Sequence, residues 1–171
     1  MFIILLILAL GLLAQTAVQP ANYGQADAGT EGNPYQIATW QNLYWITAPG
    51  TIDGLTQAQR STKHYLQTNN IDFPQTGADD IHNWDNGQGW LPIGFYTGKY
   101  NGNNKTISGM YINRPTANGQ GFFLVLGANS EINDLGLLNI NVTGNDFTGG
   151  LVGKSDSYMD LDFQNHSLNN C

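Results

Sequence analysis

Gly121-Phe122-Phe123 returns as Gly150-Leu151-Val152, 29 positions further along the chain (121 to 150). A second pattern, two apolar residues three positions apart, occurs at Ile107–Met110, Ile132–Leu135 and Leu168–Cys171, at intervals of 25 (107 to 132) and 36 (132 to 168) residues. Repetition every 20 to 50 residues, roughly, is typical of stacked folds, in which each coil covers the apolar face of its neighbour. The sequence from residue 90 onward therefore predicts a stack of β coils.

The geometry that fits these coils best is a right-handed parallel β-helix. The segment Leu138–Thr143 alternates strictly between apolar and polar residues, which predicts a strand with one buried and one solvated face. Corners are expected at glycines, which adopt a positive φ at little cost, namely Gly94, Gly98, Gly102, Gly109, Gly127, Gly136, Gly144 and Gly149. We expect an inward group of Ile107, Ile112, Ile132, Leu135, Leu137, Ile140 and Val142, and an outward group that includes Asn133 and Asn139. A β-sandwich is the competing fold, and the residues alone leave the two open.

The composition excludes several other classes of protein. The chain has 171 residues, 21 of them glycine, which argues against a helical bundle because glycine is a poor helix former. Six Lys and Arg against 13 Asp and Glu give a net charge of −7 without any basic cluster, so a nucleic-acid backbone would be repelled. The sequence therefore predicts no nucleic-acid partner.

The chain opens with an uncharged apolar run, Met1–Leu13, which is too short to span a bilayer and matches the core of a signal peptide. We predict a Sec-type signal peptide over residues 1–20, with cleavage after Ala14 or Ala17, and leave these residues out of the fold. This predicts a secreted or cell-surface protein with no membrane span once the signal is removed. The single cysteine, Cys171, excludes a disulfide within the chain, and we expect it to be a small apolar residue in a strand.

Three regions are expected after the signal peptide: a polar spacer over 21–32, a small α/β capping region over 33–89, and β-helix coils over 90–171. In the capping region, residues 57–66 form the only plausible helix. Residues 65–68 and 70–73 alternate like short strands, and residues 74–89 read as a polar loop.

The segment Gly149-Gly150-Leu151-Val152-Gly153 resembles the signature of the GLUG-repeat proteins. The lead-in Trp90–Ile112 is similar to the same family in its Trp-x-Pro-Ile-Gly turn, its Asn-Gly-Asn segment and its Ile-x-Gly-Met strand. Residues 132–142 resemble the next coil and residues 33–37 the usual entry, so the resemblance covers roughly residues 32–153. The chain departs from the pattern at Gly121-Phe122, where the family usually has a second glycine, and in residues 158–163, which read as an insertion.

This resemblance implies a pectin-lyase-like β-helix in exported bacterial surface proteins. Similar repeats occur in adhesin-like chains and beside the catalytic part of IgA-cleaving metallopeptidases. Since a solenoid needs several stacked units and a polar cap, we expect the chain to be the N-terminal piece of a longer protein.

No catalytic constellation stands out in the sequence, and we predict that the protein is not an enzyme. The three histidines, His64, His82 and His166, do not form a zinc motif. A polysaccharide lyase or hydrolase on the same scaffold is the alternative. It would need acids from adjacent coils to converge in one groove with an arginine or lysine, and Arg60 and Arg114 are the only arginines.

Two groups of acidic residues are weak calcium candidates, because clustered oxygen ligands can bind calcium at extracellular concentrations. The first is Asp79, Asp80 and Asp85, and the second is Asp156, Asp160 and Asp162. Neither follows the EF-hand pattern, so solvated loops are the favoured interpretation. We therefore expect no cofactor.

Five aromatic residues crowd one stretch of the chain: Trp84, Trp90, Phe95, Tyr96 and Tyr100. Aromatic side chains can hold sugar rings or apolar partners, but we expect these to plug the open first coil, which would otherwise expose apolar surface.

Together these features predict a non-catalytic exported module, adhesin-like or a structural spacer. It would bind a surface glycan or a host or matrix protein through a rigid polar β face. A stalk segment of a surface peptidase is a further alternative.

Overall fold

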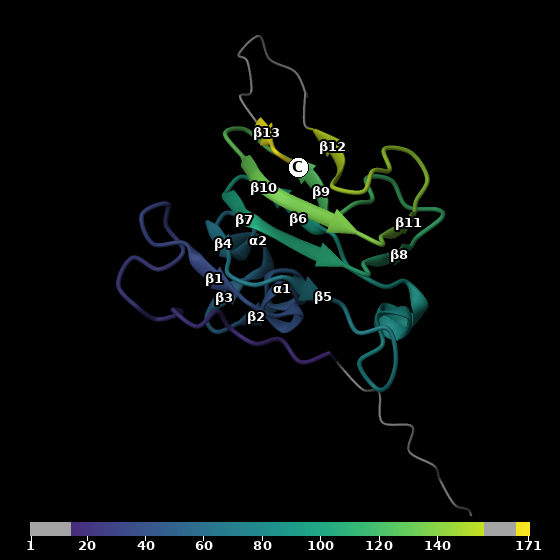
Figure 1. Ribbon diagram of the computed structural model, residues 1–171, viewed down its shortest axis with the longest axis horizontal. Helices are drawn as coiled ribbons and strands as arrows, with labels where there is room; N and C mark the ends of the chain where they lie inside the picture. The colour runs from purple at the N-terminus through teal and green to yellow at the C-terminus, as the bar shows by residue number, and fades with distance from the viewer. Residues whose placement is uncertain (1–14, 156–166) are drawn as a thin grey trace, which may run out of the picture.

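Parallel strands stacked in rungs form the main architecture of the protein (Figure 1), whose computed structural model describes residues 15–155 and 167–171. The helical elements are short: α1 (Trp40–Thr47), α2 (Gln57–Arg60) and the 3₁₀ segment η1 (Ile81–Gly87). The strands are β1 (Tyr35–Ile37), β2 (Thr51–Ile52), β3 (Leu55–Thr56), β4 (Tyr65–Gln67), β5 (Ile71–Asp72), β6 (Ile93–Tyr96), β7 (Lys99–Ser108), β8 (Tyr111–Asn113), β9 (Phe123–Leu126), β10 (Glu131–Leu138), β11 (Asn141–Thr143), β12 (Val152–Ser155) and β13 (Ser167–Asn169).

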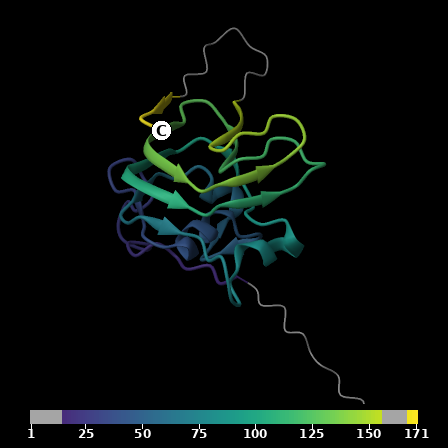
Figure 2. The same ribbon diagram turned by 45° about the vertical axis from the view of Figure 1, so that its right-hand side comes forward.

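Three parallel sheets run through the stack. The long sheet has the order β1-β4-β7-β10-β13, with β5 also paired to β7, while β6-β9-β12 and β8-β11 form the other two. Successive rungs lie one above another from the N-terminal to the C-terminal end (Figure 2). Among the described residues the only antiparallel pair of named strands is β2 with β3, which does not fit a β-sandwich. The predicted mostly β architecture of stacked parallel coils is therefore confirmed at this level.

The register confirms one of the two repeats and corrects the other. Phe123 lies beside Val152, as the 29-residue repeat predicts. Ile132 lies beside Leu168 and Tyr100, but Ile107 lies beside Leu137, so the predicted equivalence of Ile107 and Ile132 is wrong. The physical reason is the spacing of the rungs: β7 and β10 pair at an offset of 32 residues at Tyr100 and Ile132 and of 30 residues at Ile107 and Leu137, with an irregularity between Asn133 and Leu135, so an interval of 25 residues joins positions that are not paired.

The alternating segment Leu138–Thr143 is not one strand. β10 ends at Leu138, the chain turns at Asn139 with φ of 50°, and β11 begins at Asn141. Asparagine tolerates this left-handed conformation better than most residues. The chain therefore turns at an asparagine, although the sequence predicted that corners lie at glycines. Of the predicted inward residues four are buried, namely Ile107, Ile112, Ile132 and Leu135, and three are partly buried, namely Leu137, Ile140 and Val142.

The helix predicted over residues 57–66 ends at Arg60, and the longer helix α1 was missed. At its start Thr39 accepts a hydrogen bond from the backbone amide of Asn42, and the Asn42 side chain accepts one in return from the backbone amide of Thr39. This reciprocal cap stabilises a first turn whose inner face is buried. The strands predicted over 65–68 and 70–73 are confirmed as β4 and β5, and η1 lies within the predicted loop 74–89.

The long sheet crosses the expected boundary at residue 90. β4 pairs with β7 in parallel, with Tyr65 beside Tyr100, and β1 pairs with β4, with Tyr35 beside Tyr65. Region 33–89 therefore contributes strands to the same stack in addition to its helices. The inward tyrosines form a ladder whose ring centroids are 5.9 Å and 6.3 Å apart.

The segment 21–32, predicted to be a polar spacer, is packed on the molecule. The buried Asn22 side chain donates to the carbonyl of Pro34 (2.9 Å) and accepts from the backbone amide of Gln36 (3.0 Å), so it satisfies backbone groups along β1. Even Val18, within the predicted signal region, donates its backbone amide to the carbonyl of Gln41 (3.2 Å). The apolar run itself falls in residues 1–14, outside the described residues. In the part of the chain that the structure describes, no helix has the length and hydropathy needed to cross a membrane.

Candidate functional site

The motif Gly149–Gly153 forms a corner that stacks on the preceding rung. The backbone amide of Gly149 donates to the carbonyl of Gln120 (2.9 Å), and the amide of Phe122 donates to the carbonyl of Gly150 (3.0 Å). A Cβ at Gly153 would lie 2.3 Å from the carbonyl carbon of Gly119. The glycines therefore allow two backbones to approach closely, which is a role in packing between rungs.

Replacing Gly153 by alanine is expected to lower the free energy of unfolding by about 1 to 3 kcal/mol, because the new methyl group would collide with backbone that cannot turn aside. Urea unfolding followed by circular dichroism measures this loss. Gly32→Ala is the matched control, since a Cβ at Gly32 meets nothing within 4 Å. Equal unfolding midpoints for the two variants would contradict the close approach.

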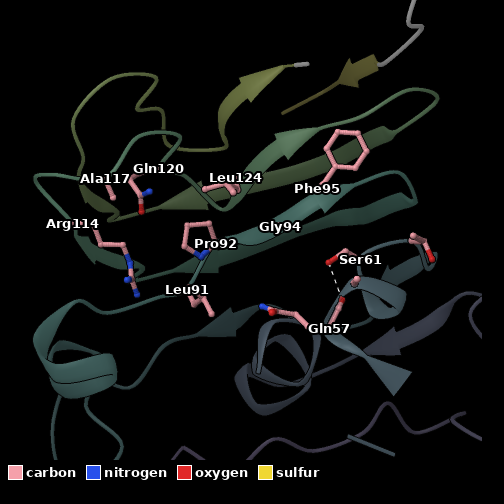
Figure 3. Close-up of a pocket in the computed structure, with 12 residues that line it drawn as sticks. Gln57, Ser61, Leu91, Pro92, Gly94, Phe95, Arg114, Ala117, Gln120 and Leu124 are labelled. Carbon is pink, nitrogen blue, oxygen red and sulfur yellow. Dashed lines mark hydrogen bonds between the residues drawn. The ribbon is translucent and has the colours of Figure 1, made fainter. Parts of the chain in front are cut away.

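A groove of about 580 Å³ lies beside the sheet β6-β9-β12, between α2 and the segment 114–120 (Figure 3). This volume is within the usual range for small-molecule sites. Most of its lining is apolar, with polar groups concentrated at Arg114, Gln120 and α2. The lining residues are Gln57, Ala58, Ser61, Thr62, Leu91, Pro92, Gly94, Phe95, Arg114, Ala117, Gln120 and Leu124.

Arg114 and Gln120 lie toward the same end of the groove (Figure 3). The guanidinium of Arg114 forms an ion pair with Asp85 (Nη2 to Oδ2, 2.7 Å) and donates to Oε1 of Gln88 (2.6 Å). The side-chain amide of Gln120, a residue only 3% exposed, donates to the carbonyl of Asn118 (2.9 Å). Within the described residues, Nε of Arg114 and Oε1 of Gln120 are buried without a hydrogen-bond partner. Both residues line the groove, while these two atoms have almost no accessible surface of their own.

Phe95 lies at the opposite end of the groove from Arg114 (Figure 3) and is 52% exposed. The other four members of the predicted aromatic cluster, Trp84, Trp90, Tyr96 and Tyr100, are buried in the core. They do not plug an open first coil, because β1 and β4 add strands below β7. That prediction is therefore corrected, and only Phe95 presents its ring to solvent.

A charged cluster lies at the start of β7 and β10. Nζ of Lys99 is 2.7 Å from Oε1 of Glu31 and 3.1 Å from Oε1 of Glu131, which come from different levels of the stack. His64 lines the same small pocket. These are acids from separate coils gathered around a lysine, the arrangement that a lyase or hydrolase would need, and the sequence reasoning did not single them out.

The electrostatics of this cluster favour a structural ion pair over a general acid or base. Hydrogen bonding with Lys99 lowers the pKa of the Glu31 carboxyl, and the hydrogen bonds that Lys99 donates to Glu31 and Glu131 raise the pKa of Lys99. Both shifts move away from neutral pH, whereas a general acid or base works best with a pKa near the working pH. Burial lowers the pKa of His64, whose Nδ1 is buried without a hydrogen-bond partner among the described residues.

The lowered pKa of His64 predicts a loss of stability on mild acidification. Below the unfolded-state pKa of about 6.5, the unfolded chain takes up a proton that the folded chain resists, so the stability present above that pH declines as pH falls toward the folded-state pKa. Thermal unfolding of the wild type and of His64→Gln between pH 7.5 and 5.5 measures this effect. We expect a shallower slope in the variant, and parallel slopes would contradict a desolvated His64.

The weak calcium candidates Asp79, Asp80 and Asp85 each contact a different partner and do not converge. Asp80 accepts hydrogen bonds from the backbone amide of His82 (3.0 Å) and interacts with its ring Nδ1 (2.7 Å), while Asp85 pairs with Arg114. Asp79 uses its backbone carbonyl to accept from Nε1 of Trp84 (2.7 Å). Over residues 15–155 and 167–171, no three His, Cys, Asp or Glu side chains gather where they could hold a metal ion. The second group (Asp156, Asp160, Asp162) and His166 lie outside the described residues, and Cys171 is exposed after β13.

Asparagines stand in register on the long sheet. Asn101, Asn133 and Asn169 occupy equivalent positions on β7, β10 and β13, and the Asn169 amide donates to Oδ1 of Asn133 (2.8 Å). One residue further, the Asn170 amide donates to Oδ1 of Asp134 (2.9 Å). We call the row Asn101–Asn133–Asn169 the asparagine ladder. It gives this sheet a polar face that continues from rung to rung.

Two known proteins are similar in sequence over most of this chain. Halomucin of Haloquadratum walsbyi is 38% identical over 132 residues, which cover 74% of this chain and 1% of halomucin. A protein of Evansella cellulosilytica described as a Gly-rich membrane protein is 32% identical over 148 residues, which cover 80% of this chain and 16% of that protein. The chain therefore spans only a small part of the length of these relatives. No family model matches the chain, and no solved structure matches it significantly.

Proposed function

We propose that this chain is a non-catalytic repeat module of an exported surface protein, adhesin-like or a structural spacer, built as a right-handed parallel β-helix of the pectin-lyase type with GLUG-like corners. The observation that carries the proposal is the unbroken order of parallel strands in the long sheet, with the asparagine ladder on its polar face. A stack of this kind is rigid and presents one chemistry at regular spacing. Much longer relatives, one of them described as a membrane protein, support a place among large surface proteins.

Localisation tests the export part of this proposal. The full chain with a C-terminal epitope tag is produced in a bacterium with a general secretory pathway. We expect the tag in the medium or accessible to protease on intact cells, and we expect a variant without residues 1–20 to remain inside. The same distribution for both would overturn the proposed export.

A lyase or hydrolase is the second candidate function, and the Glu31–Lys99–Glu131 cluster is the observation that favours it. The full chain is incubated with polygalacturonate and with neutral glucans, and unsaturated uronates and new reducing ends are measured. We expect neither product. Turnover that is lost in Lys99→Met would establish the enzyme and overturn the non-catalytic proposal.

A further inference from the structure

The last residues of the predicted signal peptide belong to the folded molecule. Ala17 is partly buried and packs against the hydrophobic core. The backbone amide of Val18 donates to the carbonyl of Gln41 (3.2 Å). Nδ2 of Asn42 donates to the carbonyls of Val18 (3.0 Å) and Gln19 (3.2 Å). The chain just before the predicted spacer is therefore held against the start of α1.

Asn42 makes this contact a requirement of the fold. Its side chain is only 6% exposed, and its Oδ1 accepts from the backbone amides of Ala38 and Thr39 (both 3.1 Å) at the cap of α1. The carbonyls of Val18 and Gln19 are the acceptors for its Nδ2. A buried donor that loses its acceptors is costly. A cut at the end of the predicted region 1–20 would remove both acceptors, so the mature chain must begin at or before Val18.

This requirement leaves the two candidate cuts, after Ala14 and after Ala17. A cut after Ala17 would remove the core contact of Ala17. It would also remove Gln15, which is partly buried and lines a small pocket together with Tyr44 and Trp84. A cut after Ala14 keeps all of these contacts.

The sequence around the two bonds agrees with this choice. A signal-peptide cleavage site has small residues directly before the cut and two positions earlier. Both candidates have an alanine directly before the cut. The earlier position is Gln15 for the cut after Ala17, which is long and polar, and Leu12 for the cut after Ala14, which is at least apolar.

We propose that the exported chain is cleaved between Ala14 and Gln15, and that residues 15–20 remain as a strap that holds the start of α1. The step is hydrolysis of one peptide bond by the signal peptidase of the cell. Water adds to the carbonyl carbon of Ala14, and the amino group of Gln15 leaves. This inference rests on the proposed export and shortens the predicted signal peptide from 1–20 to 1–14.

The N-terminus of the secreted protein tests the proposal. The full chain with a C-terminal epitope tag is produced in a bacterium with a general secretory pathway, and the tagged product is analysed by mass spectrometry of the intact chain and of its N-terminal peptide. We expect Gln15 as the first residue. A secreted product that begins at Val18 or at any other residue overturns the cleavage site and leaves export standing. An uncut chain inside the cell overturns both.

Ala14→Leu and Ala17→Leu are a matched pair of variants, because each places the same bulky residue directly before one candidate cut. Pulse labelling measures precursor and mature chain before a less stable product is degraded. We expect Ala14→Leu to lower the yield of the chain that begins at Gln15 at least tenfold, because the cut needs a small residue before it. Ala17→Leu should be cut at the wild-type bond. The opposite pattern, or equal processing of both variants, would overturn the proposal.

Discussion

Replacing Arg60 by leucine is expected to lower the free energy of unfolding by about 3 to 5 kcal/mol, the usual cost of breaking a buried charged network from one side. The Arg60 side chain is fully buried and donates to the backbone carbonyls of Ile46, Ala48, Gly50 and Leu55. Its guanidinium also lies 5.4 Å from the centre of the Trp45 ring. An apolar replacement removes the donor from these carbonyls, of which those of Ile46 and Ala48 belong to buried residues, and no second mutation can remove a backbone group.

Denaturant unfolding of Arg60→Leu, Arg60→Lys and Lys105→Met distinguishes this network from a general effect of charge. Arg60→Lys should recover little, because one ammonium cannot reach carbonyls on several sides as a planar guanidinium does. Lys105→Met removes a charge that is only partly buried and should change stability by less than about 0.5 kcal/mol. A small loss in Arg60→Leu would mean that water or rearranged backbone replaces the guanidinium.

Replacing Trp90 by alanine is expected to cost about 3 to 5 kcal/mol, the usual range for emptying a large buried aromatic site. The Trp90 side chain is fully buried, and its ring stacks on Phe122 with centroids 5.5 Å apart and planes 7° apart. It also packs against Phe73 at 5.3 Å and donates from Nε1 to the carbonyl of Phe122 (3.3 Å). The variant therefore loses contacts that join successive rungs.

Thermal unfolding of Trp90→Ala and Trp90→Phe measures this contribution. The phenylalanine variant keeps part of the stacking and should lie between the wild type and Trp90→Ala. If Trp90→Ala instead lost binding of a saccharide at unchanged stability, Trp90 would belong to a binding surface and its place in the core would be contradicted.

The sequence predicted the stack itself because local patterns determine it. Gly121 before Phe122 and Gly150 before Leu151 mark equivalent corners, and the two segments lie side by side. Ile107, Ile112, Ile132 and Leu135 are apolar at positions where strands alternate, and all four are buried. These patterns of apolar residues and glycines can be recognised from a few neighbouring residues.

Other features depend on contacts that a local pattern does not contain. The turn at Asn139 interrupts an alternation that looks continuous, and the irregularity between Asn133 and Leu135 shifts the register of the repeat. The groove gathers residues from segments near 57–62, 91–95 and 114–124, which only stacking brings together. Phe95 was noticed among the aromatic residues, but its exposure follows from which side of β6 it occupies.

In the parallel register of the long sheet, each strand between the two ends of the path pairs with the strands directly above and below it in the stack. A copied unit of roughly thirty residues inserted into such a column would meet the same pairing surface that its template met, so growth by duplication requires no redesign of the remaining levels. Duplication within such a gene can therefore lengthen the stack while the side chains of the existing levels stay the same.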